Sequence, residues 1–161
     1  MLNLIIFTVA LFLSVLPLTA QDMKQGNEIE LSTGIRAQVI LQLPPENEIA
    51  GGHRIDIIEN GKTSTVYEKK IPNLGGLGKP PHGMIYSGLV LENNGLIAYT
   101  THTSNTILFI KISRNGQDWV ATSVTEKPKN TGEISVKSVQ ILSPTTATMV
   151  MSDGATTDVS L

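Results

Sequence analysis

The sequence predicts an all-β protein built from antiparallel hairpins, and three observations support this. Short apolar, β-branched runs recur along most of the chain and end at turn-forming residues. No run shows the periodicity of an amphipathic helix. Asx-Gly pairs, which suit the positive φ angles of tight hairpin turns, separate the apolar runs. These pairs are Asn60-Gly61, Asn94-Gly95, Asn115-Gly116 and Asp153-Gly154.

The start of the chain has the pattern of a signal peptide. An apolar run, Leu4–Leu16, is followed by a proline and by a small residue, Ala20, at the expected cleavage site. The stretch is shorter than the ~20 apolar residues that span a bilayer, and the polar residue Gln21 follows it. We therefore expect cleavage after Ala20, a secreted or periplasmic location, and no transmembrane helix in the mature chain.

The composition limits the classes of function. A chain of 161 residues suits one domain, which we expect over residues 21–161. The net charge of −2 and the presence of only three arginines argue against a nucleic-acid partner, which needs a basic face. The absence of cysteine excludes disulfides, thiolate zinc sites, iron–sulfur clusters and a cysteine nucleophile.

The strands that follow the signal peptide can be grouped into three repeating units. These units cover residues 36–71, 88–126 and 136–161, and the third lacks a fourth strand. Units of about forty residues with four strands are typical of β-propeller blades. A small β-sandwich or barrel is the alternative architecture. The predicted strands, in order, are Ala37–Leu43, Arg54–Glu59, Thr63–Tyr67, Leu89–Leu91, Leu96–Thr101, Ile107–Ile112, Trp119–Val124, Val136–Leu142, Ala147–Met151 and Ala155–Leu161.

The run Ile107–Ile112 is apolar on both faces, which indicates a central strand covered on both sides. We expect Leu108, Ile110 and Ile112 to be buried on one face of it. The expected hairpin partner begins at Trp119, which we place in the same core.

The second unit resembles a blade of the sialidase-like propellers. Gly88–Ala98 is similar to the entry strands of such a blade, and Ser113–Trp119 is similar to a degenerate Asp-box hairpin. For an active enzyme the resemblance would imply an arginine triad, a tyrosine nucleophile and an acidic partner. Nothing in the sequence brings Arg36, Arg54 and Arg114 together, so no catalytic residue is carried over.

Other site chemistry is not indicated. His53, His82 and His102 lie in three separate segments near turns or loops, where exposed histidines are common, so we expect no metal site and no cofactor. Asp56 falls three residues after His53 and therefore on the opposite face of a strand. The acidic residues beside turns suit turn formation and solubility.

The connection Ile71–Met84 is long and rich in glycine and proline, and such loops are uncommon and frequently functional. It presents Lys79 and His82, which could accept an anionic group of a ligand. The alternative is a plain connector.

The final strand raises a separate question, because an unpaired edge exposes backbone donors and acceptors. We expect that edge to be closed by Ile29–Gln42 or by a second subunit in a homo-oligomer. The predicted function is a non-catalytic β domain that acts in binding or assembly outside the cytoplasm, with a glycan or protein partner. The alternative is a truncated or degenerate sialidase-like propeller glycosidase without an intact active site.

Overall fold

The computed structural model describes residues 28–42, 51–71, 83–101, 104–129 and 136–161. These residues form eleven strands and no helix, and all strand pairs are antiparallel, which confirms the all-β prediction. The strands are β1 Glu28–Ser32, β2 Ile35–Gln42, β3 Gly51–Glu59, β4 Lys62–Ile71, β5 Gly83–Leu91, β6 Asn94–Thr101, β7 Thr106–Asn115, β8 Asp118–Pro128, β9 Val136–Ser143, β10 Thr146–Met151 and β11 Thr156–Ser160. The signal peptide prediction concerns residues outside the described part.

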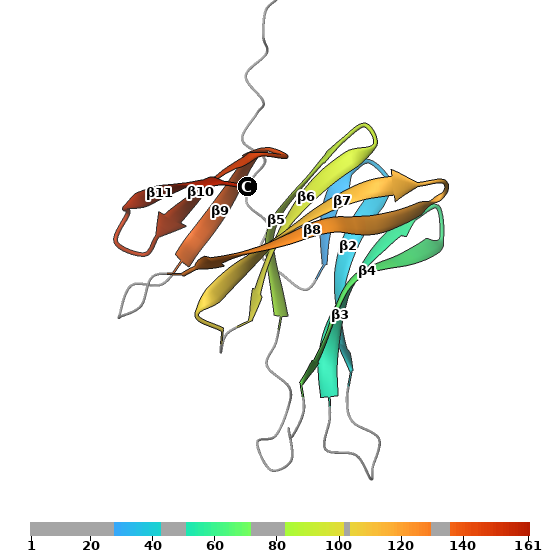
Figure 1. The fold of residues 1–161 in the computed structure, drawn as a ribbon, viewed down its shortest axis with the longest axis horizontal. Coiled ribbons are helices and arrows are strands. Elements are labelled where there is room, and N and C mark those ends of the chain that lie inside the picture. The colour runs from blue at the N-terminus through green and yellow to red at the C-terminus, as the bar shows by residue number, and fades with distance from the viewer. Residues whose placement is uncertain (1–27, 43–50, 72–82, 102–103, 130–135) are drawn as a thin grey trace, which may run out of the picture.

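The strands form three separate meanders, in which each strand pairs with its neighbour in sequence (Figure 1). The first sheet has the order β1-β2-β3-β4, the middle sheet β5-β6-β7-β8 and the third sheet β9-β10-β11. The prediction that Ile29–Gln42 closes the edge of the final strand is wrong. That segment forms β1 and β2, which pair with each other and with β3.

Three of the four predicted Asx-Gly turns are confirmed, with glycines at positive φ at Gly61, Gly116 and Gly154. The fourth predicted hairpin also forms, between β5 and β6, but its turn is misplaced. The turn residues are Glu92 and Asn93, with Glu92 at φ 50°, and Asn94 and Gly95 lie in β6.

A different requirement explains the glycine in β6. A Cβ at Gly95 would lie 2.8 Å from the backbone oxygen of Leu89 and 3.0 Å from Cγ1 of Ile112. Close packing within the middle sheet, and not turn geometry, therefore selects glycine at this position.

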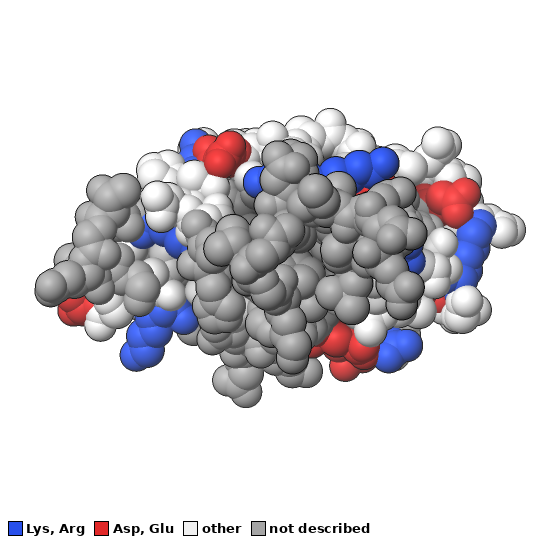
Figure 2. All heavy atoms as spheres, turned by 90° about the horizontal axis from the view of Figure 1, so that it is seen from below, with Lys and Arg blue, Asp and Glu red and all other residues white. Residues whose placement is uncertain are grey.

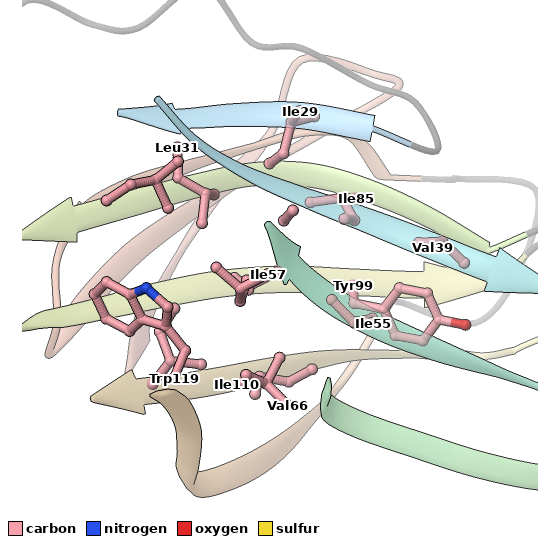
Figure 3. Packing of buried hydrophobic residues seen from close by; sticks show 14 residues of the cluster. Ile29, Leu31, Val39, Ile55, Ile57, Val66, Ile85, Tyr99, Ile110 and Trp119 are labelled. Carbon is pink, nitrogen blue, oxygen red and sulfur yellow. The ribbon is translucent and has the colours of Figure 1, made fainter. Parts of the chain in front are cut away.

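The middle sheet lies between the other two and shares a hydrophobic core with each (Figure 1). Side chains alternate across a strand, so neighbouring residues of β6 enter different cores. Ile97 belongs to the first core, between the first and middle sheets, and Leu96 belongs to the second core, between the middle and third sheets. Figure 3 shows the first core.

The predicted central strand is confirmed. β7 lies between β6 and β8, and Ile110, Ile112 and Trp119 are buried in the first core with Leu108 half-buried against it. The opposite face of β7 supplies Phe109 to the second core. The strand is apolar on both faces because each face packs into a different hydrophobic core.

Candidate functional site

The predicted ligand-loop residues Lys79 and His82 lie outside the described residues, but both ends of their connection are described. It leaves β4 after Ile71 and enters β5 at Gly83, at the lower end of the stack in Figure 1. The described residues beside these two ends would therefore border any site that the connection forms.

The beginning of β5 lies directly against Tyr99 of β6. A Cβ built at Gly83 would be 2.6 Å from Cε2 of Tyr99, 2.7 Å from its hydroxyl oxygen and 2.9 Å from Cγ1 of Val39. A side chain at this position would force the side chains of Tyr99 and Val39 to move. Glycine at the end of the connection therefore allows close contact with the tyrosine.

Tyr99 is part of an aromatic cluster with His53 of β3 and Tyr67 of β4. The ring centroids are 5.2 Å apart for His53 and Tyr99, 5.9 Å for Tyr67 and Tyr99, and 6.5 Å for His53 and Tyr67. Such separations are typical of favourable contacts between tilted aromatic rings. The first sheet contributes His53 and Tyr67, and the middle sheet contributes Tyr99, so the cluster bridges the two sheets.

The aromatic cluster contains buried polar atoms that lack partners. His53 is 1 % exposed, and within the described residues neither of its ring nitrogens nor the Tyr99 hydroxyl has a hydrogen-bond partner. Each unpaired buried polar group costs about 1–3 kcal/mol, and native proteins contain few of them. These three atoms form the most unusual chemical feature of the described structure.

The three side chains of the aromatic cluster are neutral near pH 7. Burial lowers the pKa of the His53 imidazole, and the charge of Lys69 lowers it further. Burial raises the pKa of the Tyr99 hydroxyl far above its usual range, and it also raises the pKa of Tyr67. The neutral imidazole has one donor and one acceptor, and each tyrosine hydroxyl can donate or accept. The cluster thus has the capacity to bind polar groups by hydrogen bonds without a formal charge of its own.

The position of His53 corrects the expectation that the histidines are exposed. The signal was present in the sequence, because His53, Ile55 and Ile57 alternate along one face of β3. The structure buries all three. Asp56 points to the opposite face, as predicted, and accepts hydrogen bonds from Arg54 and from the Thr65 hydroxyl. His82 and His102 lie outside the described residues.

The three arginines lie in separate ion pairs. Each one forms an ion pair with a different carboxylate: Arg36 with Glu28 at 2.7 Å, Arg54 with Asp56 at 3.0 Å, and Arg114 with Glu59. An arginine clamp for a carboxylate is therefore not formed by these residues. No group of three histidine or acidic residues that could hold a metal ion occurs in the described ranges.

The lower face of the molecule carries charges of both signs. Figure 2 shows this face, where Lys and Arg are interspersed with Asp and Glu among the described residues. No helix that is long and apolar enough to cross a membrane occurs in the part of the chain that the structure describes.

No model of a protein family matches the chain, and neither a curated protein nor a solved structure matches it.

Proposed function

We propose that the protein is a non-catalytic β domain that binds a ligand outside the cytoplasm, at the end of the stack where residues 72–82 connect β4 to β5. The observation that carries this proposal is the set of unpartnered polar atoms of His53 and Tyr99, buried beside Gly83. Binding sites combine an apolar and aromatic lining with a few polar groups that orient the ligand. The aromatic cluster supplies both kinds of group.

The ligand we propose carries an anionic group, such as the carboxylate or sulfate of an acidic glycan. Lys79 would supply positive charge and His82 a titratable group, on a connection that ends against Tyr99. A contact between exposed charges weakens as the salt concentration rises, because ions screen it. Affinity for acidic glycans should therefore fall with added salt.

The test is a screen of the purified protein against sulfated and carboxylated glycans at low and high salt. We expect the double substitution Lys79→Ala with His82→Ala to lower the affinity for every glycan that binds. Lys62→Ala is the matched control, because Lys62 is an exposed lysine in a hairpin and pairs with Asp118. Equal affinity of the wild type and the double variant would show that residues 72–82 are a connector.

Export is the second part of the proposal, and it rests on the pattern of residues 1–20. An intact-mass measurement on protein from the extracytoplasmic fraction should give a chain that begins at Gln21. Retention of Met1–Ala20 on protein recovered from the cytoplasm would contradict it.

The alternative, a degenerate relative of propeller glycosidases, is supported by the way the sheets stack. β1 packs against β5, and β5 packs against β9, so the first strands of the three meanders are neighbours, and the last strands β4 and β8 also pack together. Propeller blades repeat four-stranded meanders around a common axis in this manner. If the intact mass exceeds that of residues 21–161, with further hairpins in the added chain, the alternative is favoured over a self-contained binding module.

A further inference from the structure

Among the described residues the third sheet has three strands and each of the other two has four, and a groove lies between the third sheet and β8. In the first sheet the fourth strand, β4, packs against β8. The third sheet ends at β11, and the described residues place no strand beside it.

The groove, of about 220 Å³, separates β8 from β10 and β11. Its floor is apolar, because the nearly buried side chains of Met149, Met151 and Val159 line it. Its other lining residues are Lys127, Pro128, Thr157, Asp158 and Ser160. A strand added to β11 would therefore meet free backbone groups at its edge and apolar side chains beneath it.

The backbone of β11 shows which groups face the open edge. The Leu161 N–H donates to the Thr145 oxygen at 3.0 Å, and the Ala155 oxygen accepts from the Met151 N–H at 2.8 Å, so the odd-numbered residues face β10. In an antiparallel ladder the direction of the N–H and C=O groups alternates from residue to residue. The N–H and C=O groups of Thr156, Asp158 and Ser160 therefore face the open edge.

We infer that a second copy of the chain binds at this edge, with the two β11 strands antiparallel about a two-fold axis at Val159. A partner strand on an exposed sheet edge gains main-chain hydrogen bonds and side-chain packing together. In this arrangement each β11 occupies the fourth-strand position of the other copy's third sheet. The interaction is reciprocal, as a two-fold interface requires, and both grooves are covered at once. This surface lies on a different sheet from the proposed ligand site and does not depend on it.

Charge and strand length select the register. An axis at Asp158 would place the two Asp158 carboxylates opposite each other, and like charges in that position are destabilising. An axis at Thr157 would extend the pairing into the turn at Gly154, where φ is 88°. An axis at Val159 places Val159 opposite its own copy and Asp158 opposite Ser160. The two Val159 residues then form a pair that shares no backbone hydrogen bonds, and opposing side chains come closest in such pairs.

The contact involves a short strand, and stable dimers usually bury more surface than one such edge provides. We therefore expect a reversible dimer, and the test is sedimentation velocity of the purified protein from micromolar to millimolar concentration. Ser160→Pro removes an N–H that faces the open edge, while Ser160→Ala keeps it. Because the edge bond is lost in both copies, we expect the proline variant to raise the dimer dissociation constant by about tenfold or more. The alanine variant should dimerise like the wild type.

Thermal unfolding at low concentration shows whether the proline variant is folded, and Asp158→Pro, which removes the edge-facing N–H that this register places opposite Ser160 of the other copy, is a second variant of the same kind. A wild-type protein that stays monomeric over the whole concentration range would overturn the inference. Equal dimerisation of the wild type and both proline variants would overturn it as well.

Because the chain contains no cysteine, disulfide trapping can test the register without background. A mixture of Asp158→Cys and Ser160→Cys proteins should form a mixed disulfide on oxidation, because these positions face each other. Asp158→Cys alone should not cross-link, since the two copies of that residue are offset beyond the ~7 Å between Cα atoms that a disulfide spans. Efficient cross-linking of Asp158→Cys alone, with none in the mixture, would contradict the axis at Val159.

Discussion

Trp119 and Glu59 belong to hairpins of different sheets, and the indole Nε1 of Trp119 donates to a carboxylate oxygen of Glu59 at 3.1 Å. The other carboxylate oxygen accepts from Arg114, whose guanidinium carbon lies 4.4 Å from the centre of the Trp119 ring. The backbone N–H of Trp119 also donates to the Ser64 hydroxyl at 3.1 Å. These contacts join the β3–β4 hairpin to the β7–β8 hairpin.

Removal of the Glu59 carboxylate should therefore weaken the contact between the first and middle sheets. We expect Glu59→Ala to lower the free energy of unfolding by about 1–3 kcal/mol, because it leaves the indole and guanidinium groups without their acceptor. The measurement is urea denaturation. Lys62→Ala is the control, because it breaks an exposed ion pair between the same two hairpins and should cost less than about 1 kcal/mol. Equal losses in the two variants would contradict a special role for Glu59.

Gly88 fixes how closely β1 approaches β5. A Cβ at Gly88 would overlap Cδ2 of Leu31 and lie 3.1 Å from Cδ1 of Ile29, and both side chains are buried. Gly88→Ala should destabilise the protein by about 1–3 kcal/mol through overpacking. In the double variant with Leu31→Ala the two losses should be less than additive, because the smaller side chain makes room for the new methyl group. Strict additivity in urea denaturation would show that the two positions do not compete for space.

The buried His53 should make the stability depend on pH. Burial, and then Lys69, lowers its folded-state pKa below the ordinary value of 6.5, so the unfolded chain binds a proton before the folded chain does. Stability should therefore fall as the pH drops below about 6.5, until the folded-state pKa is reached. Urea denaturation at about pH 7.5 and pH 5.5 measures the difference.

His53→Phe serves as the comparison, because it keeps an aromatic ring and cannot be protonated. We expect its stability to change less between the two pH values than that of the wild type. The prediction fails if both proteins lose the same free energy on acidification.

The first core should depend strongly on the central strand. Ile110 is fully buried, and Ile110→Ala should cost about 2–5 kcal/mol. Leu108 is only half-buried, so Leu108→Ala should cost less. Leu142 is 46 % exposed, and Leu142→Ala should change the free energy of unfolding by less than about 0.5 kcal/mol. The free energies of unfolding are measured by urea denaturation. If the losses of the three variants do not follow this order, the assignment of β7 to the interior is contradicted.

The strands and most hairpins could be predicted because their signals are local. The pair Asn60-Gly61 adopts positive φ at both residues, which such a turn requires whatever surrounds it. The failure at Gly95 has a different origin, because that glycine accommodates Leu89 and Ile112. Its requirement comes from packing, so turn chemistry alone could not identify it.

The aromatic cluster could not be predicted, because His53 and Tyr99 are far apart in the sequence and meet only through the packing of two sheets. The alternation of His53 with Ile55 could have placed its side chain on an inward face. It could not have indicated which residues of the middle sheet lie opposite. Lys79 and His82 remain predictions, since both lie outside the described residues.

The middle sheet has consequences for how the chain tolerates change. Successive residues of β6 are divided between two hydrophobic cores, and every residue of that strand after Asn94 is buried. A single inserted or deleted residue would send every following side chain into the opposite core. In a sheet with one solvated face such a slip exposes apolar groups, whereas here it would mismatch two interiors at once. We therefore expect length changes to be confined to the connections between sheets, with the register of β6 as the most constrained feature of the chain.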